Sequence, residues 1–348
     1  MTNQRRAVAL ISGGLDSMLA AQLILDQGIH VEGINFYTGF CVEGHTHAIR
    51  KKDRNRAKRN DALWVAEQLG IKLHIIDVIE EYKDVLLNPK HGYGANMNPC
   101  LDCKCFMVGK AREWMAENDF DFIITGEVLG QRPMSQRRDA MQIVVKNTNT
   151  NDRLLRPLCA QRLSETLPET EGWVDRKRLL GLTGRSRKPQ IELAKNYNFN
   201  DYSQPAGGCC FLTDKAYSTK LVDMWTARND RDYELDDIML LKVGRHLRPK
   251  PHFKIIVGRE EGENRFLEGY RKQFIHLRAA HHTGPLVLLD GRVQNKEDME
   301  LAARLCARFG QGKNEPVVPI TIKELDKEEY TLDVNPMKAS DIPESWYL

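Results

Sequence analysis

The stretch Val8-Ala9-Leu10-Ile11-Ser12-Gly13-Gly14-Leu15-Asp16-Ser17 decides the fold, because an apolar strand runs directly into a glycine turn and then into a helical pattern. Two adjacent glycines let the backbone approach an anion closely, and the hydroxyls of Ser12 and Ser17 add hydrogen-bond donors. The following helix presents free N–H groups and the positive end of its dipole. The stretch predicts a site for nucleotide phosphates, with Asp16 as a Mg²⁺ ligand or as the helix N-cap. The alternative is an ordinary strand-to-helix turn.

Outward from this turn, short apolar runs alternate with helical patterns up to about residue 130, which is typical of βαβ units and a parallel sheet. The expected strands are Val8–Ile11, His30–Asn35, Lys72–Asp77 and Phe122–Thr125. The expected helices are Asp16–Gln27, Arg56–Leu69, Cys103–Glu117 and, later, Pro189–Asn196. Right-handed crossovers collect the carboxyl ends of the strands at one edge, where ligands of such sheets bind. We therefore expect a doubly wound α/β unit with its site at that edge.

A cluster of Pro, Gly and Cys residues at positions 204–210 interrupts this pattern, and we place a domain boundary just beyond it. The predicted domains are residues 1–218 and residues 219–348. In the second, smaller α+β unit, the expected elements are strands Phe253–Val257, Phe274–Arg278 and Pro285–Leu289, helices Glu260–Lys272 and Asn295–Phe309, and one or two strands after residue 316.

Composition excludes several classes of protein. The chain has 348 residues, 41% of them hydrophobic, which is enough to bury a core in each of two units and excludes disorder as the default. No run approaches the roughly 20 apolar residues of a membrane span. The first residues also lack the profile of a cleavable secretory signal. We therefore expect a cytoplasmic protein with no membrane partner.

The cysteines are clustered, which in a chain of this size favours chemistry over a disulfide framework. Cys100 and Cys103 form a Cys-x-x-Cys pair before a helix, and Cys209 and Cys210 follow more than a hundred residues later. Such a pair with a distant third thiolate can hold three irons of a [4Fe-4S] cluster and leave the fourth iron open. We take Cys209 as the third ligand and Cys210 as its competitor. The remaining isolated cysteines that we expect to be buried small hydrophobes are Cys41, Cys159 and Cys306.

Two other interpretations of the cysteines stay open. Four thiolates from the two pairs can bind zinc tetrahedrally. Alternatively, one cysteine carries a persulfide and another resolves it by forming a disulfide.

The string Ser12–Ser17 resembles the signature of the PP-loop, or adenine nucleotide alpha hydrolase-like, ATP pyrophosphatases. Residues 125–131 with Ser135-Gln136, and then Leu155-Arg156-Pro157-Leu158, resemble the tRNA thiouridine synthetases, which include 4-thiouridine synthetases and 2-thiouridylases. This resemblance covers about residues 6–215. It implies cleavage of ATP to AMP and pyrophosphate, with a carbonyl oxygen activated as its adenylate. It also implies that hydrosulfide at the open iron is the sulfur nucleophile.

The resemblance therefore implies an ATP-dependent tRNA sulfurtransferase that uses ATP, Mg²⁺ and a [4Fe-4S] cluster. Its implied partners are tRNA and a sulfur donor, either sulfide or a persulfide derived from a cysteine desulfurase. The catalytic residues would be Asp16, Cys100, Cys103 and Cys209. The ATP contacts would come from Ser12, Gly13, Gly14, Asp16, Ser17, Asn35, Phe36, Tyr37, Gly126, Gln131 and Arg156. A small-molecule acceptor for the same chemistry, or an RNA-binding protein with a degenerate nucleotide site, are the alternatives.

Two basic stretches of the second unit, Gly244–Lys250 and Phe253–Arg259, resemble the RNA-binding domain of the NFACT family. Phosphate contacts of basic side chains supply affinity without reading sequence. The alternative is a structural or dimerisation domain with ordinary solvated charge. Over the whole chain, the candidate RNA contacts are Arg54, Arg56, Arg59, Arg185, Arg187, Arg245, Arg248 and Lys254.

Overall fold

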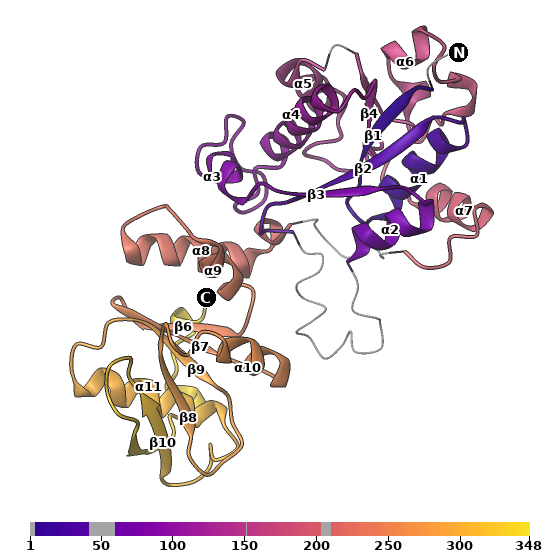
Figure 1. Ribbon diagram of the computed structural model, residues 1–348. Helices are drawn as coiled ribbons and strands as arrows, with labels where there is room; N and C mark the ends of the chain where they lie inside the picture. The colour runs from indigo at the N-terminus through magenta and orange to yellow at the C-terminus, as the bar shows by residue number, and fades with distance from the viewer. Residues whose placement is uncertain (1–3, 42–59, 151, 203–209) are drawn as a thin grey trace. The chain divides into compact units, whose positions relative to one another are not determined.

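The computed structural model describes residues 4–41, 60–150, 152–202 and 210–348, and the chain divides into two compact units (Figure 1). The first unit ends at Thr213 and the second runs from Asp214 to Leu348. The boundary that we predicted near residue 218 falls inside helix α8 (Lys215–Arg228), whose first turn is capped by the Asp214 carboxylate. The helix belongs to the second unit, where the Tyr217 hydroxyl donates to the carbonyl of Ile238.

The first unit is built on a five-stranded parallel sheet in the order β3-β2-β1-β4-β5. The strands are β1 (Arg6–Leu10), β2 (His30–Tyr37), β3 (Leu73–Asp77), β4 (Phe122–Ile124) and β5 (Leu154–Leu155). Successive side chains of a strand point to opposite faces. Ala7 and Ala9 of β1 therefore join the core on one face, while Val8 joins the core on the other. The predicted parallel α/β fold is confirmed.

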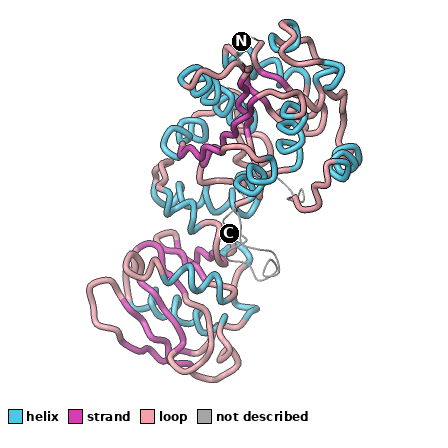
Figure 2. The backbone as a smooth tube through the Cα atoms, turned by 45° about the vertical axis from the view of Figure 1, so that its right-hand side comes forward, coloured by secondary structure: helices cyan, strands magenta, loops and turns pink. Residues whose placement is uncertain are grey.

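Helices cover both faces of this sheet, as Figure 2 shows for the strands and helices of the first unit. One face carries α1 (Leu15–Leu25), α2 (Asp61–Leu69) and α7 (Lys188–Asn196). The other carries α4 (Cys100–Glu117) and α5 (Arg138–Thr148), with α3 (Ile79–Leu87) beside α4. A one-turn helix, α6 (Leu167–Thr170), lies in the segment after β5. The sequence did not predict α3 or α5, and α4 begins at Cys100 rather than at Cys103.

The second unit contains a six-stranded antiparallel sheet in the order β11-β10-β8-β9-β7-β6. Its strands are β6 (Arg245–Lys250), β7 (Phe253–Val257), β8 (Ile275–Ala279), β9 (Val287–Gly291), β10 (Val318–Lys323) and β11 (Tyr330–Val334). Its other helices are α9 (Leu235–Leu240), α10 (Glu261–Glu268) and α11 (Lys296–Phe309). Apolar residues of α11 share a core with β7, β8, β9 and β10. This confirms the smaller α+β unit, although β6, α8 and α9 were not predicted.

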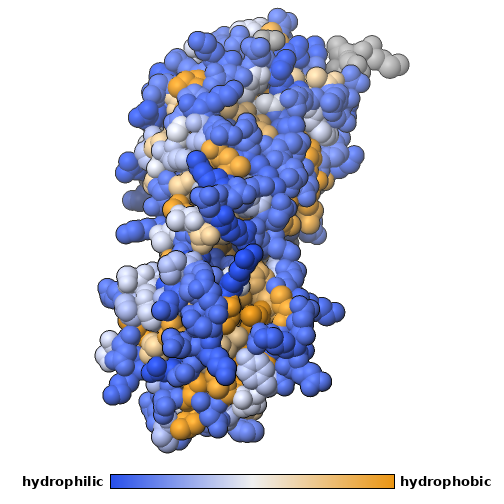
Figure 3. Space-filling model, turned by 90° about the vertical axis from the view of Figure 1, so that its left-hand side faces the viewer, coloured by the Kyte–Doolittle hydropathy of each residue, from blue (hydrophilic) through white to orange (hydrophobic). Residues whose placement is uncertain are grey.

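The face of the molecule seen in Figure 3 is largely hydrophilic, and apolar side chains appear on it in small groups. None of the helices in the described ranges combines the length and the apolar character that crossing a membrane requires.

Gly126 fixes how closely the end of β4 approaches the start of α1. A Cβ atom at this residue would lie 2.5 Å from the carbonyl carbon and oxygen of Asp16 and 2.5 Å from the amide nitrogen of Ser17. These are backbone atoms of the first helical turn, so a side chain can fit only if the helix or the strand moves. The close approach therefore requires glycine.

We expect Gly126→Ala to lower the free energy of unfolding by about 1–3 kcal/mol, as overpacking does in other proteins. Gly109→Ala is the matched control, because Gly109 lies inside α4 and no atom surrounds the position of its Cβ. That control should gain about 0.5–1 kcal/mol, the difference in helix preference between the two residues. Urea unfolding of both variants measures this, and equal stability of Gly126→Ala and the wild type would contradict the close approach.

Candidate active site

The loop between β1 and α1 is stabilised by its own serine hydroxyls. The Ser17 hydroxyl donates to the carbonyl of Gly14 over 2.8 Å and accepts from the amide of Ser12 over 3.3 Å. Gly13 has φ 79°, in the left-handed region that favours glycine. Gly14 is the N-cap of α1 and makes no side-chain cap hydrogen bond, so the first N–H groups of the helix suit an anion. Asp16 lies inside the first turn, so the interpretation of Asp16 as the N-cap is wrong.

The Asp16 carboxylate collects side chains from two distant segments. Its Oδ2 accepts from Gln131 Nε2 over 2.6 Å and from Arg187 Nη2 over 3.3 Å. Gln190 of α7 holds Gln131 in turn, because its Nε2 donates to Gln131 Oε1 over 2.9 Å. The Asp16 Oδ1 atom is buried and has no hydrogen-bond partner among the described residues. A buried carboxylate oxygen without a donor is suited to a hard cation, so the residues fit Mg²⁺.

The end of β2 is tied to the same loop. Asn35 Nδ2 donates to the carbonyl of Ile11 over 2.7 Å. The Phe36 side chain is buried in the core on the α4 face, so only its backbone is available at the sheet edge. Burial raises the pKa of the Tyr37 hydroxyl, and electrostatic interactions with Cys41 and Asp77 raise it further. The predicted contacts of residues 35–37 with ATP stay a prediction.

Arg156 forms an ion pair with Glu127 in the interior of the unit. Arg156 Nε lies 3.0 Å from Glu127 Oε2, and the two side chains are 5% and 2% exposed. Thr125 donates to the same oxygen over 2.9 Å. Burial alone would raise the pKa of Glu127, but the charges of Lys104 and Arg156 and these hydrogen bonds lower it. Neither Glu127 nor Lys104 was among the predicted site residues.

The remaining contacts of Arg156 point to α5 rather than to the phosphate loop. Its Nη2 donates to the carbonyl of Met141 over 3.4 Å. Arg156 also lines a hollow of about 280 Å³ between α5 and residues 154–169, and none of the residues 12–17 lines this hollow. The predicted contact of Arg156 with ATP therefore stays a prediction. In this structure the Arg156 side chain is held by its ion pair with Glu127.

Arg187 was predicted to contact RNA, but its guanidinium lies against Asp16 of the phosphate loop. Arg185 is exposed and remains available to RNA. Gln190 was missed, although it lies three residues after Arg187, and residues with that spacing share a helix face. Arg54, Arg56 and Arg59 lie outside the described residues.

The Cys-x-x-Cys pair lies at the N-terminus of α4. Cys100 begins the helix and Cys103 lies one turn later, both partly exposed. Asp102, between them, accepts from the backbone amide of His91 over 2.9 Å and contacts His91 Nδ1 at 2.9 Å. This carboxylate therefore anchors the loop that precedes α4.

The described residues supply two of the three predicted cluster ligands, because Cys209 lies outside them. Among the described residues, no group of three His, Cys, Asp or Glu side chains could hold a metal ion. The donor set is therefore consistent with a cluster only if residue 209 or another thiolate joins Cys100 and Cys103. The zinc interpretation also depends on Cys209.

The three cysteines that we expected to be buried behave differently from one another. Cys159 and Cys306 are buried, and burial raises their pKa values to about 11 and about 12. These two predictions are confirmed. Cys41 is partly exposed and lies opposite Cys210 in an antiparallel bridge, so its interpretation as an isolated buried residue is wrong.

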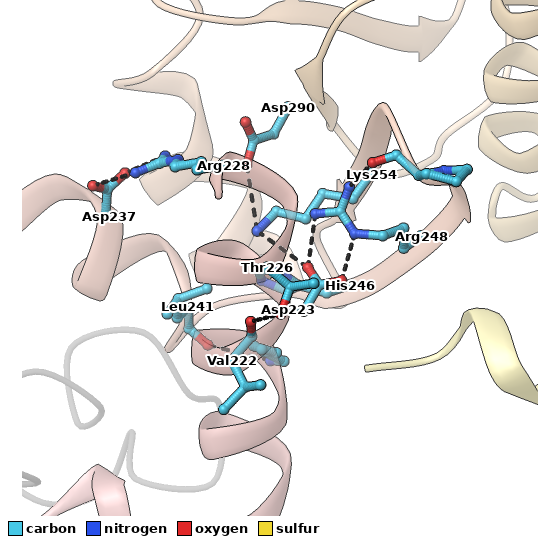
Figure 4. A network of polar contacts seen from close by, with 12 residues as sticks. Val222, Asp223, Thr226, Arg228, Asp237, Leu241, His246, Arg248, Lys254 and Asp290 are labelled. Atoms are coloured by element: carbon cyan, nitrogen blue, oxygen red, sulfur yellow. Dashed lines mark hydrogen bonds and ion pairs between the residues drawn. The ribbon is translucent and has the colours of Figure 1, made fainter. Parts of the chain in front are cut away.

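In the second unit, two of the predicted RNA contacts are paired with carboxylates. Arg248 binds both carboxylate oxygens of Asp223, one of them at 2.7 Å from Nη2. Lys254 is 2% exposed, and its Nζ lies 3.3 Å from Asp290 and 4.0 Å from Asp223 (Figure 4). A phosphate cannot reach Lys254 in this arrangement, so we omit it from the proposed RNA surface. The Arg245 guanidinium lies 4.7 Å from the centroid of the Phe309 ring.

Two models of known protein families each match most of one unit. The family model described as Thiamine biosynthesis protein (ThiI) matches residues 2–165, which contain the phosphate loop, Gln131 and the Cys-x-x-Cys pair. Over these residues the first unit is similar to that family. The model described as NFACT protein RNA binding domain matches residues 244–347, in the second unit.

Individual relatives match parts of this chain. The tRNA-specific 2-thiouridylase MnmA of Marinobacter nauticus is 26% identical over 221 residues, which are 61% of this chain and 52% of the relative. The tRNA-specific 2-thiouridylase MnmA of Petrotoga mobilis is 30% identical over 133 residues, 36% of each chain. The chain thus spans about half the length, or less, of these curated relatives. Among solved structures, a 4-thiouridine synthetase in complex with RNA and bound ATP is 20% identical, with TM-score 0.41 over 61% of this chain and 46% of that chain.

The ion pair between Glu127 and Arg156 inside the first unit predicts a pH-dependent stability. The pKa of Glu127 is lowered on folding, so its ionised form stabilises the protein above its unfolded pKa of about 4.3. This contribution is lost as the pH falls through the lower folded pKa. Glu127→Gln leaves Arg156 buried and unpaired, so we expect it to cost about 3–5 kcal/mol near pH 7.

Urea unfolding between pH 3 and pH 7 tests this. The difference between the wild type and Glu127→Gln should shrink below about pH 4. Glu81→Gln is the control, because the Glu81–Lys110 pair is at the surface and such pairs contribute about 0–1 kcal/mol. A loss of stability in Glu127→Gln as small as in Glu81→Gln would contradict a structural ion pair.

Proposed function

We propose that the protein is an ATP-dependent tRNA sulfurtransferase, which adenylates the carbonyl oxygen of a uridine and replaces this oxygen with sulfur. The observation that carries the proposal is the convergence of Gln131 and Arg187 on Asp16 at the phosphate loop of a tRNA thiouridine synthetase-type domain. A carbonyl oxygen is a poor leaving group, whereas adenylate is a good one. Spending ATP in this way therefore has a clear chemical purpose.

Different residues at the loop would contact different parts of ATP. The amides and hydroxyls of residues 12–17 would bind the pyrophosphate portion, and the Asp16 carboxylate would hold Mg²⁺. The bound ion would neutralise charge on the phosphates and orient them. Arg187 and Gln131 are placed to stabilise the charge that develops on the α-phosphate as the uridine oxygen attacks. Gln190 positions Gln131 for this role.

For the sulfur step we propose a [4Fe-4S] cluster on Cys100, Cys103 and Cys209, with Cys210 as the competing third ligand. The support is the position of the first two thiols on one turn at the start of α4, at the sheet edge that also carries the phosphate loop. A bound cluster would supply an open iron site for hydrosulfide. Anaerobic purification with iron and acid-labile sulfide assays should give about four of each per chain, and zinc alone would contradict the cluster.

The substrate base must leave the stacked tRNA before it can enter a site at a sheet edge. We propose that the NFACT-type domain and exposed basic residues such as Arg185 hold the tRNA backbone during this step. The sulfur donor is sulfide or a persulfide, and the reaction takes place in the cytoplasm. An enzyme with a small-molecule acceptor would not need to bind tRNA. Filter binding with tRNA distinguishes the two kinds of acceptor.

Release of pyrophosphate from ATP should depend on unmodified tRNA and should fall about 10²-fold or more in Asp16→Asn, because the variant loses a charge that organises the phosphates. Glu113→Gln, on the exposed side of α4, is the matched carboxylate control and should keep the wild-type rate. Release that ignores RNA would count against the tRNA substrate. Release that survives in Asp16→Asn would count against the phosphate loop.

A second pair of variants separates RNA contacts from structural charges. Arg185→Ala should weaken tRNA binding and reduce the slope of log affinity against log salt by about one, with unchanged thermal stability. Arg248→Met should instead lower the thermal stability of the second unit, since it leaves the Asp223 carboxylate without its bidentate partner. Filter binding at several salt concentrations and thermal melts give both results. Equal salt slopes for Arg185→Ala and the wild type would remove Arg185 from the RNA surface.

A further inference from the structure

A hollow of about 490 Å³ lies in the second unit, where the residues after β7, before β9 and after α11 come together. Three glycines of these segments, Gly258, Gly284 and Gly310, line it, so a ligand can approach the main chain closely. The glycines also pack tightly. A Cβ atom at Gly258 would lie 2.0 Å from Asn264 Oδ1, and a Cβ atom at Gly284 would lie 3.3 Å from the Cα of Gly310. These close contacts fix the walls of the hollow.

The hollow carries positive charge. Of the described residues that line it, Arg259 and Lys313 are cationic and none is acidic. The Glu263 carboxylate, which is 2% exposed, accepts from Arg259 Nε over 3.0 Å and also from Arg259 Nη2. This contact fixes the orientation of the guanidinium and leaves its Nη1 group for a ligand. Because Glu263 offsets part of the charge of Arg259, the exposed Lys313 contributes most of the net charge.

An aromatic ring lies beside these cations. Phe309, the last residue of α11, lines the hollow and is only partly buried. The Arg245 guanidinium lies 4.7 Å from the centroid of the same ring, within the range of a cation–π contact. Arg245, which the sequence predicted as an RNA contact, therefore supports the ring that faces the hollow. Exposed aromatic rings among basic side chains are the usual platform for unpaired nucleic acid bases.

Polar side chains complete the lining. Asn264 Oδ1 accepts from the amide of Leu286 over 3.0 Å, so the Nδ2 group of Asn264 is the part of this side chain that can donate to a ligand. Thr283 and Gln311 line the hollow from exposed positions. Amide and hydroxyl groups of this kind bind the edges of bases that are not paired. The hollow thus combines a stacking surface, cations and hydrogen-bonding groups.

We propose that this hollow binds one unpaired nucleotide of RNA, whose base stacks on Phe309 and whose phosphate contacts Lys313 and Arg259 Nη1. The volume lies within the range of about 300–1,000 Å³ that is usual for sites of small ligands. Paired bases are stacked on one another and cannot enter such a site, so it selects single-stranded RNA. The proposal rests on the proposed function only for the identity of the RNA as tRNA. It adds that the second unit binds an unpaired part of the substrate.

Fluorescence anisotropy of labelled RNA tests the site with the full-length protein and without ATP. The probes are a single-stranded RNA hexamer of mixed sequence and an RNA duplex. Phe309→Leu should weaken binding of the hexamer about tenfold and leave binding of the duplex unchanged, because only an unpaired base can stack on the ring. Lys313→Ala should reduce the slope of log affinity for the hexamer against log salt by about 0.7, the loss of one phosphate contact. A hexamer that binds no tighter than uridine 5′-monophosphate would overturn the assignment to RNA.

Phe274→Leu and Lys296→Ala are the matched controls. Phe274 is a partly buried phenylalanine of the same unit that does not line the hollow, and Lys296 is exposed at the opposite end of α11 from Phe309. Both variants should bind the hexamer as the wild type does. Equal losses in Phe309→Leu and Phe274→Leu, or in Lys313→Ala and Lys296→Ala, would overturn the site.

Cross-linking of the unmutated protein keeps the test valid even if Phe309→Leu fails to fold. Ultraviolet irradiation with the hexamer, followed by peptide mapping with mass spectrometry, should place a cross-linked base on the peptide that contains Phe309. Cross-links confined to other peptides would overturn the site. If this cross-link forms but tRNA-dependent pyrophosphate release is absent, the proposed function fails and the nucleotide site stands. If release occurs but the cross-link is absent, the site fails and the proposed function stands.

Discussion

The structure of the first unit depends on the contact between the first turn of α1 and the backbone of Gly126. Because a Cβ atom at residue 126 has no space, the end of β4 lies directly against Asp16 and Ser17. The residues that follow Gly126 then leave the sheet beside the loop, which brings Gln131 within 2.6 Å of the Asp16 carboxylate. The phosphate loop is therefore organised by a neighbouring strand and not only by its own glycines.

Charge is used differently in the two units. At the phosphate loop, Asp16 keeps one buried oxygen without a hydrogen-bond donor, a state that costs free energy unless a cation or ligand group compensates it. In the second unit, Asp223, Arg248, Lys254 and Asp290 satisfy one another. Paired charges of this kind hold α8 against the sheet and are not available to a ligand. The contrast supports a ligand site in the first unit and a structural role for the buried network in the second.

The fold and the nucleotide end of the site could be predicted because they are local in sequence. The strand, the glycine turn and the helix of residues 8–25 are contiguous, and the parallel order follows from the alternation of elements. Helices α3 and α5 were missed although each carries buried apolar residues at helical spacing, because both are short and lie among polar residues. Five of the six residues of β6 are Arg, His, Lys or Pro, so its sequence is not typical of a strand.

The long-range parts of the site could not be predicted. The pairing of Arg156 with Glu127, of Arg187 with Asp16 and of Cys41 with Cys210 joins segments between 29 and 171 residues apart. Each of these side chains is ambiguous in the sequence, since an arginine serves equally for phosphate, for a carboxylate or for solvent. Only the crossover geometry of the sheet selects the partner.

The contact between Asp102 and His91 changes how the Cys-x-x-Cys pair is understood. Asp102, which lies between the two cysteines, points toward the preceding loop. Its carboxylate connects this loop to the helix by contacting the backbone amide and the imidazole of His91. A substitution of Asp102 would therefore be harmful because the loop loses its anchor, even in a protein that held no metal. Sequence surveys that count only cysteines at this spacing would overlook the part of the motif that sets where the thiols stand.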